Sequence, residues 1–227
     1  MSIYEVKPLA HREKKLDSRS VHGCLLIHNN PAAAASEQYR RIRNNIRIAS
    51  GKKERLSLVI TSPSSGEGKS TSAVNLAISF AQRGDKVLLV DANVRNPILN
   101  QVFGIKQWPG LSDGLAIGIE FNEIVYPTNI DGLAVIPGGS PMPGAADLLD
   151  SQAMKELLER AKAEYTVILI DSPAVLDTPD AIALAGRCDG VVLILRSGKT
   201  QQKNAFEAKR LLDFGKVKIL GSLLNRS

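Results

Sequence analysis

Six short, nearly continuous apolar runs divide this chain of 227 residues, and they constrain its fold more than any other feature. They are 56–61 (LSLVIT), 86–91 (KVLLVD), 132–137 (GLAVIP), 166–171 (TVILID), 190–195 (GVVLIL) and 217–224 (VKILGSLL). Runs without polar alternation are typical of strands that are covered on both faces, as in a parallel sheet. Between most of them lie amphipathic stretches typical of helices, at 69–83, 151–164 and 201–214. The alternation predicts a doubly wound α/β fold with a mostly parallel sheet.

The composition is that of one globular domain, with 44% apolar and 23% charged residues, and it excludes a disordered or fibrous chain. No apolar stretch reaches the roughly 18 to 20 residues of a membrane-spanning helix, and the N-terminus has no signal-peptide core. Cys24 and Cys188 have no neighbours at metal-ligand spacing, which argues against a zinc site. We therefore expect a cytoplasmic protein.

The net charge of +6 is concentrated near the N-terminus, where the first 55 residues hold twelve Lys/Arg and five Asp/Glu. We expect residues 1–30 to form a flexible basic arm and residues 31–227 to form the folded domain. Pro31, four alanines and the apolar stripe of Tyr39, Ile42 and Ile46 predict a helix over 31–50. Because no nucleic-acid-binding motif accompanies the basic arm, nucleic acid is not expected as a partner.

A segment rich in glycine and serine, 61–71 (TSPSSGEGKST), follows the first run and opens the first long helix. This context and the ending Gly68-Lys69-Ser70 are typical of a Walker A phosphate loop, although Pro63 replaces the first glycine of the consensus. Lys69 is predicted to bind the β- and γ-phosphates of a nucleotide, and the Ser70 hydroxyl to bind Mg²⁺. The expected nucleotide-binding residues are Gly66, Glu67, Gly68, Lys69, Ser70 and Thr71, with Asn225 after the last run as a candidate for the adenine edge.

Two of the apolar runs end in an aspartate, Asp91 and Asp171. The carboxyl ends of parallel strands meet at one edge of the sheet, where open α/β folds bind their ligands. Either residue alone is compatible with a simple strand end or helix cap, but two beside a phosphate loop predict metal binding or proton transfer. The candidate catalytic residues are Lys69, Asp91 and Asp171, and the candidate metal ligands are Ser70, Asp91 and Asp171.

At these motifs the chain resembles the bacterial tyrosine kinases (BY-kinases) of capsule and exopolysaccharide co-polymerase systems, over about residues 36–226. The matching stretches are 37–43 (EQYRRIR) for the E-x-x-R-x-x-R helix, 61–71 for Walker A, 88–97 (LLVDANVRNP) for the h-h-h-D-x-D-x-R motif and 168–173 (ILIDSP) for Walker B. No single stretch is decisive, but the combination in this order is specific.

The resemblance implies a P-loop enzyme with deviant Walker motifs that uses ATP and Mg²⁺ to phosphorylate protein tyrosines in exopolysaccharide or capsule biosynthesis. It also implies a ring of identical subunits in which Glu37, Arg40 and Arg43 contact a neighbour. The alternative for these three is a solvated helix face with charge pairs one turn apart. A membrane-anchored activator protein is the further implied partner, and it would place the domain at the inner face of the cell membrane.

The chain departs from the family pattern in ways that bear on activity. Asn93 stands where the second motif has its second aspartate, which is expected to weaken metal binding or proton acceptance. The last tyrosine is Tyr165, so the tyrosine cluster that family members phosphorylate at their C-terminus is missing. Both departures favour the alternative of a nucleotide-gated assembly module with little transfer to tyrosine. A partition or division-site ATPase is disfavoured because Ser64 replaces the second lysine of that loop.

Overall fold

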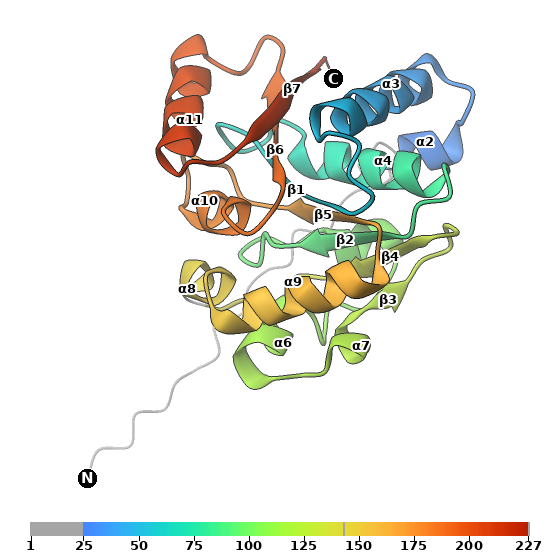
Figure 1. Cartoon of the computed structure of the whole chain (residues 1–227), viewed down its shortest axis with the longest axis vertical. Coiled ribbons are helices and arrows are strands. Elements are labelled where there is room, and N and C mark those ends of the chain that lie inside the picture. Colours follow the sequence, from blue (N-terminus) through green and yellow to red (C-terminus); the bar gives the residue numbers. More distant parts are fainter. Residues whose placement is uncertain (1–24, 143, 227) are drawn as a thin grey trace.

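A computed structural model describes residues 25–142 and 144–226, which form a seven-stranded sheet in the order β3-β4-β2-β5-β1-β6-β7 (Figure 1). The strands are β1 (Leu56–Thr61), β2 (Val87–Asp91), β3 (Tyr126–Pro127), β4 (Leu133–Ile136), β5 (Val167–Asp171), β6 (Gly190–Arg196) and β7 (Ile219–Asn225). All neighbouring strands are parallel except the edge pair β3 and β4. The predicted fold class is confirmed.

Helices cover both faces of the sheet (Figure 1). On one face lie α2 (Leu26–Asn29), α3 (Ala34–Ala49), α4 (Lys69–Ala81) and α5 (Leu99–Phe103). On the other lie α6 (Leu111–Ile117), α7 (Phe121–Ile124), α8 (Ala145–Leu149), α9 (Gln152–Glu164), α10 (Asp180–Ala185) and α11 (Gln202–Phe214).

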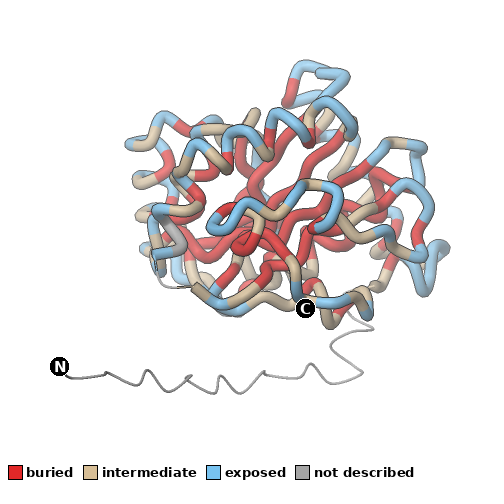
Figure 2. The backbone as a smooth tube through the Cα atoms, turned by 90° about the horizontal axis from the view of Figure 1, so that it is seen from below, coloured by how far each residue is buried: buried red, intermediate tan, exposed pale blue. Residues whose placement is uncertain are grey.

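The central strand β5 shows why the apolar runs lack polar alternation. Val167 and Leu169 pack in the cluster under α4, whereas Ile168 and Ile170 pack in the cluster under α9. Successive side chains of a strand point to opposite faces, so both faces of this strand need apolar residues. Figure 2 shows the resulting buried interior between exposed outer segments. Full burial of each Ile or Leu contributes about 1.5–3 kcal/mol to folding.

The predicted strands agree with the observed ones to within two residues at either end. Segment 92–130, between two of the predicted strands, contains α5, α6, α7 and the two-residue strand β3, none of which the sequence predicts. These helices span four to seven residues, too few for the 3.6-residue apolar period to appear in the sequence.

The predicted boundary of the flexible arm at residue 30 is wrong, while residues 1–24 lie outside the described part of the chain. Ile27, in α2, is completely buried in the same cluster as α4. Its backbone N–H donates to the Oδ1 atom of Asn75, 3.0 Å away, on α4. The folded domain therefore includes residues 25–30. Within the described ranges, no helix is long and apolar enough to cross a membrane.

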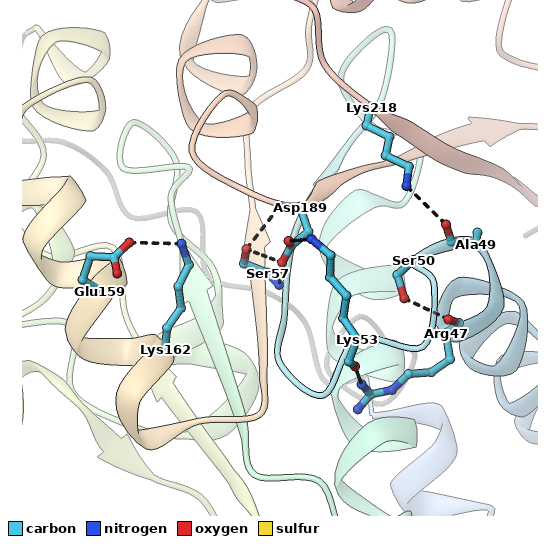
Figure 3. A network of polar contacts seen from close by, with 9 residues as sticks. All are labelled: Arg47, Ala49, Ser50, Lys53, Ser57, Glu159, Lys162, Asp189 and Lys218. Atoms are coloured by element: carbon cyan, nitrogen blue, oxygen red, sulfur yellow. Dashed lines mark hydrogen bonds and ion pairs between the residues drawn. The ribbon is translucent and has the colours of Figure 1, made fainter.

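The amino ends of the strands carry a network of paired polar groups (Figure 3). The Oδ2 atom of Asp189 accepts hydrogen bonds from the backbone N–H and the hydroxyl of Ser57, at 2.8 and 2.9 Å. Its Oδ1 atom accepts from Lys53 at 2.5 Å, and the carbonyl of Lys53 accepts from Arg47 of α3 at 2.7 Å. The network fixes the connection from α3 to β1 against the start of β6.

Candidate nucleotide-binding site

The phosphate loop connects β1 to α4 and needs glycine at two positions. Gly66 and Gly68 have φ angles of +74° and +90°, in the left-handed region that other residues rarely adopt. Gly68 is also the N-cap of α4, whose first residues are Lys69 and Ser70. The predicted strand–loop–helix context is therefore present, and the N-terminus of α4 adds positive potential at the loop.

The structure brings the two predicted aspartates together beside this loop. Asp91 and Asp171 are register partners on the parallel strands β2 and β5, and β5 in turn pairs with β1. Both side chains are completely buried. Two carboxylates on adjacent strand ends thus lie at the same edge of the sheet as the phosphate loop.

The carboxylate of Asp171 has no hydrogen bond of ordinary geometry to the described residues. Burial raises the pKa of Asp171 well above its usual range, as does the charge of Asp91, while the nearby Ser70 hydroxyl and Lys69 ammonium lower it. Burying a carboxylate without partners costs several kcal/mol. A divalent cation between Asp171 and Ser70 would supply the missing partner, so these residues fit the Mg²⁺ of a bound nucleotide.

Asp91 differs because both of its oxygens have donors. Oδ2 accepts from the backbone N–H groups of Ile98 and Leu99, at 2.9 and 3.0 Å, and Oδ1 accepts from that of Asn93 at 3.2 Å. Burial raises the pKa of Asp91, and the three N–H donors partly offset this. Asp91 therefore also organises the segment between β2 and α5, a function that the sequence did not indicate.

The predicted phosphate-loop residue Glu67 directs its side chain into the protein. Only 1% of the residue is exposed, and its carboxylate accepts from the Thr200 hydroxyl at 2.8 Å and from the Ser64 N–H at 3.3 Å. Any contact of Glu67 with a phosphate therefore has to come from its backbone N–H.

Sequence analysis missed two cations at the loop: Arg196, the last residue of β6, and Lys199, on the turn between β6 and α11. Arg196 donates to the Gly66 carbonyl at 3.0 Å, and Lys199 donates to the same carbonyl at 3.1 Å. The available signal was the stretch 197–200 (SGKT), a glycine–lysine turn directly after a buried run. Asn225 also reaches the loop, since its amide nitrogen lies 3.3 Å from the Glu67 carbonyl.

The three residues expected to contact a neighbouring subunit are engaged within the chain. Arg40 pairs with Glu37 at 2.8 Å, the one-turn charge pair of the alternative interpretation. Arg43 donates to the carbonyl of Ser79 at 2.5 Å and so ties α3 to the phosphate-loop helix α4. Contact of these residues with a second subunit stays a prediction.

The described tyrosines contribute to packing. Tyr39 packs against the cluster under α4, and Tyr165 against the cluster under α9. The hydroxyl of Tyr126 donates to the Pro109 carbonyl at 3.1 Å. Tyr4, in the expected arm, lies outside the described residues.

A phosphate loop between a buried strand and a helix, with a buried carboxylate on the adjacent strand, defines the class of P-loop nucleotide-binding α/β proteins. The AAA domain family matches residues 57–202. Over 201 residues the chain is 42% identical to tyrosine-protein kinase YwqD of Bacillus subtilis (strain 168), covering 88% of the chain and 85% of that relative. The chain belongs to the bacterial tyrosine kinase family, as its motifs predict.

Two solved structures are similar to this one. The crystal structure of the chimerical protein CapA2B2 superposes with a TM-score of 0.86 at 33% identity, covering 90% of either chain. The kinase domain of the Escherichia coli tyrosine kinase ETK superposes with a TM-score of 0.85 at 30% identity, covering 95% of this chain and 82% of that one.

Proposed function

We propose that this chain is an ATP-dependent protein tyrosine kinase domain that regulates capsule or exopolysaccharide biosynthesis and export. Its membership of the bacterial tyrosine kinase family supports the activity. The observation that carries the proposal is the completely buried carboxylate of Asp171, which lies beside Lys69 and Ser70 without a hydrogen bond of ordinary geometry to the described residues. Burial without hydrogen-bond donors is unfavourable for a carboxylate, and a nucleotide-bound Mg²⁺ would compensate it.

Each residue of the site has a proposed task. Bound ATP would supply the γ-phosphoryl group, and Mg²⁺ would neutralise charge on the phosphates. The backbone N–H groups of 66–71 would surround the phosphates, Lys69 would hold their β- and γ-oxygens, and Ser70 and Asp171 would hold the metal. Asn225 lies where the loop meets the end of β7 and is the proposed contact of the base.

Asp91 is the candidate base and a second candidate metal ligand. Its buried position one strand from Asp171 places its charge at the same edge of the sheet. Its three backbone donors keep the carboxylate in a fixed orientation. Fixed orientation is what phosphoryl transfer demands, because positioning and charge neutralisation supply most of its catalysis.

We further propose that the domain forms a ring of identical subunits at the inner face of the cell membrane, held there by a membrane-anchored activator protein. Glu37, Arg40 and Arg43 lie on α3, where the side chain of Glu37 is about half exposed. Replacing all three by alanine should shift the sedimentation coefficient toward that of the monomer. An unchanged large assembly would contradict the ring.

The kinase proposal is tested with γ-labelled ATP, Mg²⁺ and a tyrosine-rich acceptor peptide, followed by separation of phosphotyrosine from free phosphate. We expect label in phosphotyrosine and its loss in the Lys69→Met variant. Free phosphate alone would favour the alternative, a nucleotide-gated assembly module. That alternative is supported by Asn93 in the second motif and by the packing of Tyr39, Tyr126 and Tyr165 within the fold.

A further inference from the structure

Three consecutive carbonyls of the phosphate loop are held from outside by side chains that are distant in sequence. The Ser65 carbonyl accepts from Lys199 at 3.2 Å, and the Gly66 carbonyl accepts from both Lys199 and Arg196. The Glu67 carbonyl accepts from the amide of Asn225. Each of these peptide groups therefore has its oxygen directed at the β6–α11 turn or at the end of β7.

The geometry of the peptide group fixes what lies on the opposite side. In a planar trans peptide the C=O and the following N–H point in opposite directions. Holding the three carbonyls outward therefore turns the N–H groups of Gly66, Glu67 and Gly68 away from the turn. Successive N–H groups on one side of a loop form a concave anion site. With positive φ angles at Gly66 and Gly68, this backbone has the form that phosphate binding requires.

The turn that supplies the cations is itself held in shape. The Thr200 hydroxyl accepts from the backbone N–H of Arg196 at 2.7 Å and donates to the buried carboxylate of Glu67 at 2.8 Å. The fit around Lys199 is close, since a Cβ atom at Gly66 would lie 2.6 Å from its Nζ atom. The turn and the loop are thus joined through side-chain and main-chain groups together.

We propose that the turn 196–200 is a positioning element of the nucleotide site, and that Lys199 sets the affinity for the β-phosphate by holding the loop's peptide groups in their binding orientation. Lys199 acts from behind the loop, on carbonyl oxygens, and is not a catalytic residue. The inference rests on the proposed nucleotide site but not on transfer to tyrosine.

Replacing Lys199 by a residue with a side chain of similar length but no charge isolates this effect. We expect Lys199→Met to weaken binding of ADP by about three- to tenfold, because two charge-assisted hydrogen bonds are lost but the site is solvent-exposed. Lys199→Arg should restore affinity to within about twofold, since guanidinium donors reach the same two carbonyls. Lys203→Met is the matched control, because it removes the same charge from exposed α11 and forms no hydrogen bond to the described part of the loop.

The experiment is a calorimetric titration of the full chain and each variant with ADP and Mg²⁺, accompanied by melting temperatures without nucleotide. Hydrogen exchange of the nucleotide-free chain provides a second measurement, in which amides 66–68 of Lys199→Met should exchange faster than those of Lys203→Met. Equal ADP affinity of the wild type and Lys199→Met, or equal weakening by Lys203→Met, would overturn the inference.

Failure of the wild type to bind ADP would instead overturn the proposed nucleotide site itself, and the inference with it. Weaker binding in Lys199→Met with rescue in Lys199→Arg supports the inference whether or not the acceptor peptide is phosphorylated. The two proposals therefore fail in distinguishable ways.

Discussion

The two edges of the sheet each carry an aspartate, and the surroundings of these two aspartates shift their pKa values in opposite directions. At the amino edge, Asp189 receives three donors and its pKa lies below the usual range, because Lys53 and the N–H and hydroxyl of Ser57 outweigh the effect of burial. At the carboxyl edge, Asp171 is completely buried without such donors, and its pKa is raised by burial and by Asp91.

This difference separates Asp189, which stabilises the fold, from Asp171, the proposed metal ligand. A paired carboxylate lowers the free energy of the folded chain, whereas an unpaired buried one raises it and persists where a ligand compensates. Burial alone does not identify a site, since Asp180 is as completely buried as Asp171. Asp180 likewise has no hydrogen bond to the described residues but pairs with Arg95 at 3.7 Å, so the candidate site is marked by an unpaired carboxylate beside the phosphate loop.

The largest effect is expected at the carboxyl edge from Lys69→Met. Loss of the ammonium that we propose binds the β- and γ-phosphates should reduce phosphoryl transfer at least about 100-fold. The melting temperature without nucleotide should fall, because the Lys69 ammonium favours the buried carboxylate of Asp171. An unchanged rate of ATP turnover in this variant would show that the phosphate loop is not part of the active site.

Asp171→Asn should separate binding from stability at the same edge. We expect Mg²⁺-dependent nucleotide affinity to fall by about 100-fold, while the melting temperature without Mg²⁺ rises by about 2–4 °C because the like charge beside Asp91 is removed. Calorimetry with and without Mg²⁺ measures both. A lower melting temperature would show that Asp171 is structural, as Asp189 is, and would end the contrast between the two edges.

Asp189→Asn, at the amino edge, should do the reverse and lower the free energy of unfolding by about 1–2 kcal/mol with unchanged nucleotide affinity. The folded-state pKa of Asp189 lies below its unfolded value, so its contribution is fully present above the unfolded pKa of about 3.9 and is lost as the pH falls through the folded pKa. The variant and the wild type should therefore converge in stability below about pH 4. Denaturant unfolding at pH 7 and at pH 3 measures this, and a constant difference would argue against the ion pair.

The smallest effect is expected from Asn93→Asp, which restores the second acid of the motif. The backbone N–H of Asn93 donates to Asp91 and is kept in the variant. The change therefore adds one carboxylate and leaves the hydrogen bonds of Asp91 intact. We expect Mg²⁺-dependent transfer to rise about two- to fivefold, within the range of a single added charge near a metal. Steady-state rates at several Mg²⁺ concentrations provide the measurement. Unchanged rates would mean that the second acid is dispensable here.

Much of this molecule was predictable from local sequence. The strands were found because they are buried on both faces, and the phosphate loop because its glycines and its lysine are adjacent in the chain. Asp91 and Asp171 were found because parallel strands bring their carboxyl ends together. Helices α2, α5 to α8 and α10 were missed because each spans only four to seven residues, too few for an apolar period to appear or for helix propensity to accumulate.

The contacts between distant segments were not predictable. Arg196 and Lys199 contact Gly66 of the phosphate loop, which lies 130 and 133 positions earlier in the chain. A pattern in a short stretch of sequence does not indicate a contact between residues so far apart. The same holds for the two aspartates, whose positions were predicted but whose hydrogen bonds were not. Side-chain pairing depends on packing that only the assembled fold defines.

The hydrogen bond from Asn225, at the end of β7, to the phosphate loop also determines when the loop is completed during protein synthesis. The loop emerges from the ribosome early, but Asn225, which holds its third carbonyl, follows 158 positions after Glu67. At about 5–20 residues per second, the ribosome needs roughly 10–30 s to add that stretch. Until then the Glu67 carbonyl lacks its outer partner, so we expect the nascent chain to bind nucleotide more weakly than the finished domain.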